Sequence, residues 1–295
     1  MALNRSRCRV CNKQGGRFWD NWQTPKESGI HTMFMIARQL HRTFLELFPR
    51  GRHSWIVMSF VALGAMVPIT DLLVAKLFSE IIMHGSTMAT DEMVTQAVFF
   101  FGLFIVMRGL HYFQKTYKIR VFKRAFEAKG VKRNRMQENW EWSLAFELTN
   151  SLTDFAKLLV FMLFFAWLSW EFGIVNTLIL LASVQIMGYF FRKQLGVQKQ
   201  FVDNRKEKVF VKPEEAVGGR IRMGETSALM ANAGLMIILA YLLFASINGS
   251  IPQASLIVLF LGAKMQTSTL SNTSSSLMRL ARARANQVGD TEDLL

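Results

Sequence analysis

Runs of about 20 mostly apolar residues are the feature that most constrains this chain, because a run of that length crosses the hydrocarbon core of a membrane as one helix. We predict six such spans, at about 55–78, 95–113, 152–169, 173–191, 228–247 and 251–267. Soluble domains carry about 25% charged residues, whereas this chain has 19% charged and 51% hydrophobic residues. The sequence therefore predicts an all-α, polytopic membrane protein and excludes an ordinary soluble domain.

Two of the connections between spans are very short. Only WEFG separates the third span from the fourth, and only NGSIP separates the fifth from the sixth. Connections of this length predict two helical hairpins.

Basic residues fall on alternate sides of the spans, which predicts the orientation. The connections HGSTMATDE, WEFG and NGSIP contain no Lys or Arg, whereas the stretch before Trp55, the two long connections and the C-terminal tail are all basic. Because Lys and Arg near span ends favour the cytoplasmic side, we expect both termini in the cytoplasm. Topology then accounts for most of the net charge of +14, so we expect no nucleic-acid partner.

The N-terminal region is expected to comprise a basic cytoplasmic segment (1–32) and an amphipathic elbow helix (33–50) lying at the membrane interface. The elbow has Ile36 and Leu40 on its apolar face and ends at Pro49. Because the N-terminus is polar until about Met33, we expect no cleavable signal peptide, and the first span is expected to direct insertion into a bacterial inner (plasma) membrane. An Arg-rich, acid-free start leaves a mitochondrial transit segment as the alternative.

The two long basic connections are predicted to be helical extensions of the spans. Ile119, Phe122 and Phe126 recur at helical spacing after the second span. After the fourth span, Pro213 and Gly218–Gly219 predict a turn. We expect the six-helix domain with these extensions to occupy 51–285, followed by a tail at 286–295.

The order of these parts resembles the membrane domain of exporter-type ABC transporters. The likeness is carried by FLELFPRGRHSWIVMSFVALGAMVPITDLLVAKLFSEII and by the closing stretch from LLFASINGSIPQ to the C-terminus. The segments GYFFRKQLGVQKQFVDNRKEKVFV and RVFKRAFEAKGVKRNRMQENW are similar to the SbmA/BacA-type peptide transporters, which keep this membrane fold without an ATPase domain. The resemblance implies a homodimer that moves a peptide or amphipathic substrate by alternating access.

Two departures from the exporter pattern bear on the energy source. No G-x-x-x-x-G-K-[ST] phosphate loop occurs in the sequence, so we expect no ATPase activity from these residues and no cofactor. The connections at 115–151 and 191–229 are shorter than the family's, which places coupling to a separate ATPase subunit in question. A proton-coupled transporter, a partner-dependent subunit and a degenerate scaffold are the open alternatives.

Polar residues inside the spans are candidate pathway residues, because a charge in a membrane costs about 2.5 to 3.5 kcal/mol on insertion scales. The candidates for a substrate or ion pathway are Asp71, Arg108, Lys264, Gln266 and Thr267. Asp71 and Arg108 could pair across helices, or Arg108 could extend to the interface. The polar run that follows Lys264 could line water or pack tightly against another helix.

Cys8 and Cys11 form CRVC, the spacing of half a zinc site or of a dithiol pair. A reduced, inert cytoplasmic pair is the alternative. No catalytic constellation is visible, so we expect a protein that is not an enzyme. The leading hypothesis is a membrane transporter subunit, and the rival is a structural subunit of a larger secretion or conjugation assembly.

Overall fold

The computed structural model describes residues 30–48, 51–84, 90–127, 135–206 and 213–292. The chain divides into Met1–His31 and Thr32–Leu295, and the architecture below concerns the second unit. Cys8 and Cys11 lie outside the described residues.

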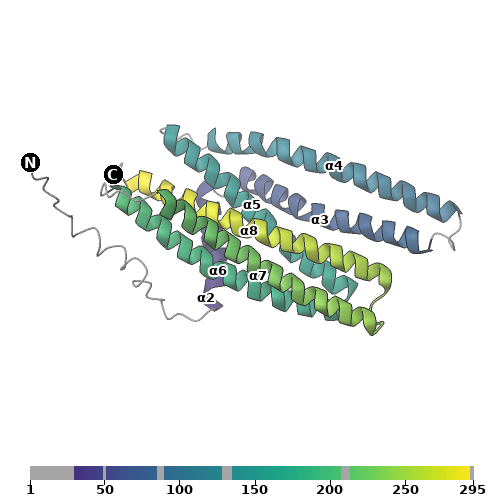
Figure 1. Cartoon of the computed structure of the whole chain (residues 1–295). Helices are drawn as coiled ribbons and strands as arrows, with labels where there is room; N and C mark the ends of the chain where they lie inside the picture. The colour runs from purple at the N-terminus through teal and green to yellow at the C-terminus, as the bar shows by residue number, and fades with distance from the viewer. Residues whose placement is uncertain (1–29, 49–50, 85–89, 128–134, 207–212, 293–295) are drawn as a thin grey trace, which may run out of the picture. The chain divides into compact units, whose positions relative to one another are not determined.

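The described residues form helices, with no strand among them. Figure 1 shows long helices running side by side, crossed by the shorter α2. The helices are α2 (Ile30–Leu47), α3 (Arg52–His84), α4 (Thr90–Glu127), α5 (Arg135–Leu168), α6 (Trp170–Lys206), α7 (Pro213–Ile247) and α8 (Gln253–Glu292).

Five of these helices are long and apolar enough to cross a membrane. The candidate spans are His53–Ile82, Val94–Glu127, Glu138–Leu168, Trp170–Gln198 and Gly224–Ile247. Helices suit a membrane because they satisfy their own backbone hydrogen bonds where no water is present. The fold is therefore that of a multi-pass, all-helical membrane protein.

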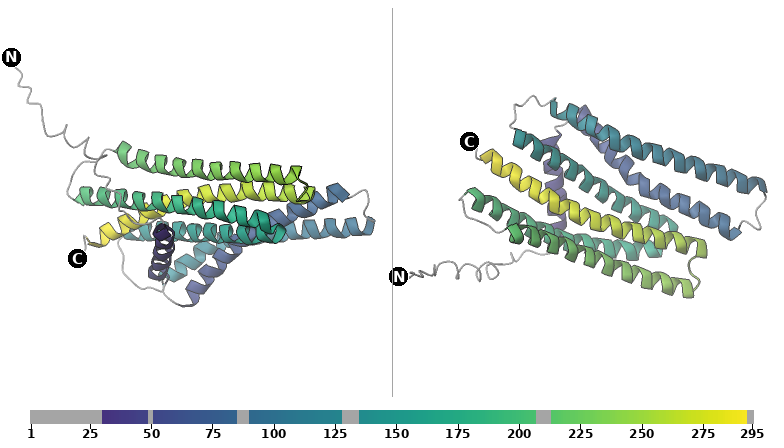
Figure 2. Two further views of the ribbon diagram at one scale, coloured as in Figure 1. Left: turned by 90° about the horizontal axis from the view of Figure 1, so that it is seen from below. Right: turned by 45° about the horizontal axis from the view of Figure 1, so that its top comes forward.

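Helix α8 is the sixth helix of the expected set, and it is not among the five candidate spans. Its second half is rich in Ser, Thr and Arg, which lowers its hydropathy. Its neighbours are α3, α5, α6 and α7, and it lies beside α5 and α7 in the views of Figures 1 and 2. A central place among other helices lets a polar helix avoid lipid, which is the physical reason that its sequence can be so polar.

Both predicted helical hairpins are present. Ser169 alone separates α5 from α6, and a Cβ at Gly173 would lie 2.6 Å from the Ala166 Cα, so only glycine permits this close approach. Helix α7 ends in a Schellman motif: the Ser250 amide donates to the Ala245 carbonyl (3.2 Å), and Gly249 adopts a φ of 66°. The short connections therefore predicted these pairings correctly.

Helix α2 is amphipathic. Its buried residues Ile36, Leu40, Phe44 and Leu47 follow helical spacing and pack into the apolar core that also contains residues of α3, α4, α5 and α8. At its end, Phe48 lies 5.5 Å from Phe122 between ring centroids. The apolar face of α2 is thus covered by protein of this same chain.

One predicted turn is wrong. Residues Pro213 and Gly218–Gly219 belong to α7, which begins at Pro213. Proline is favoured in the first turn of a helix because its missing N–H has no intrahelical partner there. The signal that suggested a turn was therefore the start of a helix.

Candidate functional site: a polar cleft between helices α5 and α8

Helix α5 carries a polar stripe at the start of its apolar stretch. Asn150, Thr153, Asp154 and Lys157 stand at positions i, i+3, i+4 and i+7, which places them on one helix face. Glu147 extends the stripe by one turn. These side chains therefore project together from α5.

Helix α8 presents a matching stripe. Exposed Lys264, Ser268, Asn272, Ser275 and Arg279 recur every three or four residues along it. The threonines on its other side, Thr267, Thr269 and Thr273, are buried and donate their hydroxyl hydrogens to the carbonyls four residues earlier, at 2.8 to 3.0 Å. One helix therefore provides both a packed face and a polar face.

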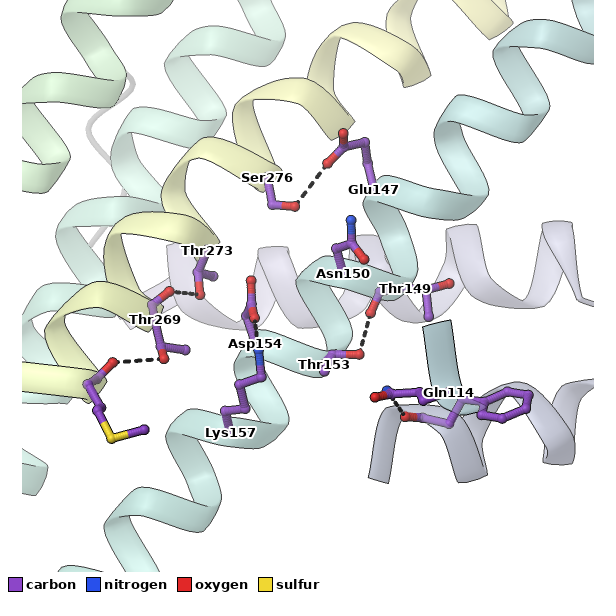
Figure 3. A network of polar contacts seen from close by, with 12 residues as sticks. Gln114, Glu147, Thr149, Asn150, Thr153, Asp154, Lys157, Thr269, Thr273 and Ser276 are labelled. Carbon is purple, nitrogen blue, oxygen red and sulfur yellow. Dashed lines mark hydrogen bonds and ion pairs between the residues drawn. The ribbon is translucent and has the colours of Figure 1, made fainter. Parts of the chain in front are cut away.

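The two stripes meet at a cavity of about 360 Å³. Every residue that lines it is polar or charged: Asn150, Thr153, Asp154, Lys157, Asn272, Ser275, Ser276 and Arg279. Figure 3 shows Glu147, Asn150 and Asp154 on the side of α5 that faces α8 and Ser276. Because α5 contains a candidate membrane span, a wholly polar cavity beside it is a functional-site candidate.

Two ion pairs organise the cleft. Within α5, the Lys157 Nζ donates to Asp154 Oδ1 at 2.8 Å, and Asp154 is only 8% exposed. Between the helices, the Arg279 Nε donates to Glu147 Oε1 at 2.7 Å, and the Ser276 hydroxyl donates to Glu147 Oε2 at 3.0 Å. Glu147 thus fixes α8 against α5 by two charge-assisted hydrogen bonds.

Helix α4 contributes a further cation. The Lys118 Nζ donates to Asn150 Oδ1 at 2.9 Å and lies 5.6 Å and 5.5 Å from the ring centroids of Phe122 and Phe146. Aromatic faces and an amide oxygen stabilise an ammonium group without neutralising it. Lys118 is also within electrostatic range of Glu147 and Asp154, so it belongs to the same charge network.

The α3–α4–α5 junction positions this cation by close helix packing. On the same face of α4, the Gln114 amide donates to the Phe60 carbonyl at 2.8 Å. A Cβ at Gly64 would overlap the Gln114 Nε2 and lie 2.7 Å from Thr153 Cγ2. Glycine at 64 therefore lets α3 approach α4 and α5 where they hold the wall of the cleft.

A second cavity of about 630 Å³ adjoins the first. It lies between α5, α7 and α8, and its lining combines apolar and charged side chains: Trp140, Ser143, Glu147, Ile221, Gly224, Glu225, Ala228, Ser271, Ser275, Met278, Arg279, Arg282 and Ala283. Ser275 and Arg279 line both cavities. The Glu147–Arg279 ion pair therefore stands between a polar and an amphipathic compartment.

Buried amides elsewhere on α6 have no partner in the described part of the chain. Asn176 and Gln194 are 0% exposed, and neither side-chain amide forms a hydrogen bond there. An unpaired buried polar group costs about 1 to 3 kcal/mol. Asn176 and Gln194 are therefore buried polar side chains inside the bundle, outside the two cavities.

The structure places Asp71 and Arg108 apart from the cleft residues. His111 on α4 interacts electrostatically with three of these charges: half-buried Asp71 on α3, Arg108 on α4 and Lys157 on α5. No ion pair joins Asp71 to Arg108 among the described residues; Arg108 is exposed and lies 5.1 Å from the Phe104 ring centroid on its own helix.

The three predicted residues on α8 divide between its two faces. Lys264 is exposed on the polar stripe, whereas Gln266 and Thr267 are 5% and 9% exposed within the helix packing. None of the three lines either cavity, because the cavities begin at Ser271 and Asn272, farther along α8. The polar run predicted from the sequence thus contains both packed and cavity-lining residues.

Glu147, Asn150, Asp154, Lys157, Lys118 and Arg279 were not predicted as site residues. The signal was present in NSLTDFAK, where four polar residues share one helix face at the edge of an apolar span. The sequence does not show that this face of α5 packs against α8, because Glu147 and Arg279 are 132 residues apart.

The fold and the cleft define a class of protein: a multi-pass helical membrane protein with a charged, polar cavity between two of its helices. The sequence matches no protein-family model, and no curated protein matches it significantly.

Proposed function

We propose that this chain is a membrane transporter subunit that moves a peptide or similar amphipathic substrate by alternating access. The observation that carries the proposal is the wholly polar cavity between α5 and α8, beside a candidate membrane span. A protein that served only as an anchor would gain stability from an apolar contact there, because burying polar groups is costly. The adjoining cavity, with both Trp140 and charged side chains, suits an amphipathic substrate.

The proposed topology has six spans with both termini in the cytoplasm of a bacterial inner membrane. The basic extensions of α4 and α6 support this orientation by the positive-inside rule. In this orientation Glu147 and Asn150, which lie nearer the start of α5 than its end, mark the cytoplasmic side of the cleft, and Asp154 and Lys157 extend it toward the middle of the bundle. We propose that α8 is the sixth span, shielded from lipid by its four neighbours.

Alternating access is proposed to involve the α5–α8 contact. The Glu147–Arg279 ion pair joins the two helices between the cavities, so its separation would connect the compartments. The driving energy is proposed to come from protons or from a separate ATPase subunit, because the sequence contains no phosphate loop.

The test is uptake of a labelled amphipathic peptide into proteoliposomes that contain the purified chain, with and without an imposed proton gradient. Ser275→Leu fills the cleft and should abolish uptake, whereas Ser268→Leu, two turns earlier on the same helix stripe and outside the cavities, should preserve it. Unchanged thermal unfolding of both variants shows that folding is intact. Equal uptake by both variants would contradict a pathway through the cleft.

A second candidate function is a structural subunit of a larger membrane assembly. Helix α4 favours it, because none of the most apolar stretch of α4 is buried inside the bundle and most of the helix contacts of α4 are with α3. Such a face contacts either lipid or another membrane protein. The mass of the gently solubilised complex separates the candidates: two chains of 33.8 kDa indicate a homodimeric transporter, and a large assembly of other proteins indicates the scaffold.

A further inference from the structure

The charges around the α5–α8 cleft do not balance. The charged side chains around the cleft form one network of five: the cations Lys118, Lys157 and Arg279 and the carboxylates Glu147 and Asp154. Each of the five interacts electrostatically with at least one other of the five. Among the described residues of this network, three cations meet two carboxylates, which leaves one positive charge. Because charges interact more strongly away from bulk water, this excess favours an anion.

The hydrogen-bond donors in the cleft are also in excess. Thr153 donates its hydroxyl hydrogen to the Thr149 carbonyl at 2.8 Å, and Ser276 donates its own to Glu147. An ammonium group has three N–H donors and a guanidinium five, whereas Lys157 and Arg279 each use one in the hydrogen bonds described above. The lining therefore offers several N–H groups to a ligand, beside acceptor oxygens that include those of Asp154, Asn272 and Ser275.

We propose that the cleft is a subsite for a carboxylate group of the substrate, bound by Lys157 and Arg279; for a peptide, this group is the C-terminal carboxylate. The inference rests on the proposed transport function and specifies its substrate. Arg279 suits this role because a guanidinium matches a carboxylate in a bidentate geometry. Its side chain is 52% exposed, so a ligand can reach it.

Asp154 acts as the competitor of the ligand. It occupies Lys157 from the same helix at 2.8 Å. A bound carboxylate must share that ammonium group, so Asp154 lowers the affinity for anions. Removal of its charge should therefore strengthen binding, opposite to the effect of removing either cation.

The experiment compares two peptides of the same sequence, one with a free C-terminal carboxylate and one with a C-terminal amide. Each carries an N-terminal fluorophore, and its affinity for the purified full chain in phosphatidylcholine nanodiscs is measured by fluorescence anisotropy. We expect the acid to bind about tenfold more tightly than the amide, the effect of one charge-assisted hydrogen bond. Equal affinities, or no binding of either peptide, would overturn the proposal.

Substitutions assign the preference to the cleft. Lys157→Gln and Arg279→Gln should each abolish it, Lys157→Arg should retain it, and Asp154→Asn should enlarge it. The control is Lys123→Gln, near the C-terminal end of α4. It removes an exposed lysine whose Nζ lies 3.8 Å from Glu127 Oε1. A preference that persists in Lys157→Gln and Arg279→Gln would overturn the assignment to this cleft.

Two further arms distinguish the possible failures. If the preference vanishes in nanodiscs that contain phosphatidylglycerol, a lipid phosphate occupies the cleft, and the carboxylate assignment is overturned. Peptide uptake is measured separately in proteoliposomes. Uptake without acid preference eliminates the subsite alone, whereas acid preference without uptake eliminates the transport function and retains the anion site.

Discussion

At the scale of single residues, Glu147 is the side chain that joins the two helices of the cleft. It accepts hydrogen bonds from Arg279 and Ser276, its side chain is 16% exposed, and it lines the larger cavity. Removal of its charge leaves Arg279 without its partner but able to reach water. The cost should thus be smaller than the 3 to 5 kcal/mol typical of a fully buried broken pair.

We expect Glu147→Gln to lower the free energy of unfolding by about 1 to 3 kcal/mol. Glu127→Gln is the control, because the Lys123–Glu127 pair is exposed on both sides at 71% and 63%; pairs of that kind contribute less than about 1 kcal/mol. Thermal or denaturant unfolding in detergent measures both. Equal effects would show that the contact between α5 and α8 contributes no more than a surface pair.

Asp71 belongs to a second group of charges, around His111. We expect Asp71→Asn to abolish peptide uptake while the protein unfolds at an unchanged temperature, because the amide keeps the shape of the carboxylate and removes its charge. Unchanged uptake in the proteoliposome assay would eliminate a pathway role for Asp71.

At the scale of helices, the connection length determines which neighbours pair. Ser169 alone between α5 and α6 forces them to run antiparallel in contact, and small residues at 166 and 173 allow the backbones to approach. Trp167, adjacent to this crossing, lies 5.2 Å from the Lys76 Nζ, so the same end of the hairpin also contacts α3. The sequence therefore specifies the hairpin through its small residues as well as its short turn.

Gly173→Ala should destabilise the protein by about 1 to 3 kcal/mol, because the new methyl group would overlap the backbone of α5 at Ala166. Gly102→Ala is a matched control in α4, where a Cβ would meet nothing within 4 Å. That control should be neutral or stabilising by up to about 1 kcal/mol, since alanine favours helix more than glycine. Unfolding curves that coincide for the two variants would contradict a close crossing at Gly173.

At the scale of the whole molecule, topology is the property that most needs measurement. Cys8 and Cys11 are the two cysteines of the chain, so replacing both with serine gives a background for single-cysteine labelling. We expect Glu171→Cys and Asn248→Cys to react with a membrane-impermeant maleimide from the outside of intact cells. Glu127→Cys and Asn286→Cys should react only in inverted vesicles.

The pair Asn248→Cys and Asn286→Cys tests whether α8 crosses the membrane, because these residues precede it and lie near its end. Labelling from opposite sides supports six spans. Labelling of both from the same side would establish five spans, with α8 as a helix that does not cross.

Much of the fold could be predicted from sequence because hydropathy and connection length are local properties. Five apolar runs became candidate spans, and the elbow appeared as α2. The turn predicted at Pro213 and Gly218–Gly219 was wrong, because proline occurs both in turns and at the first position of helices. The candidate site was harder to predict, because a single polar residue in a span is visible in the sequence, whereas the role of Asp154 and Lys157 depends on their position opposite α8.

Local hydropathy and connection length are enough to specify a multi-pass helical protein with two tight hairpins, because an apolar run of about 20 residues and a turn of a few residues allow few other structures in a membrane. The packing of α8 among four other helices, with its polar face against Asn150, Asp154 and Lys157, is a property of the folded chain. The physical reason is that lateral packing depends on the shapes and charges of whole helix faces. A contact such as that of Glu147 with Arg279 joins residues that no local pattern relates.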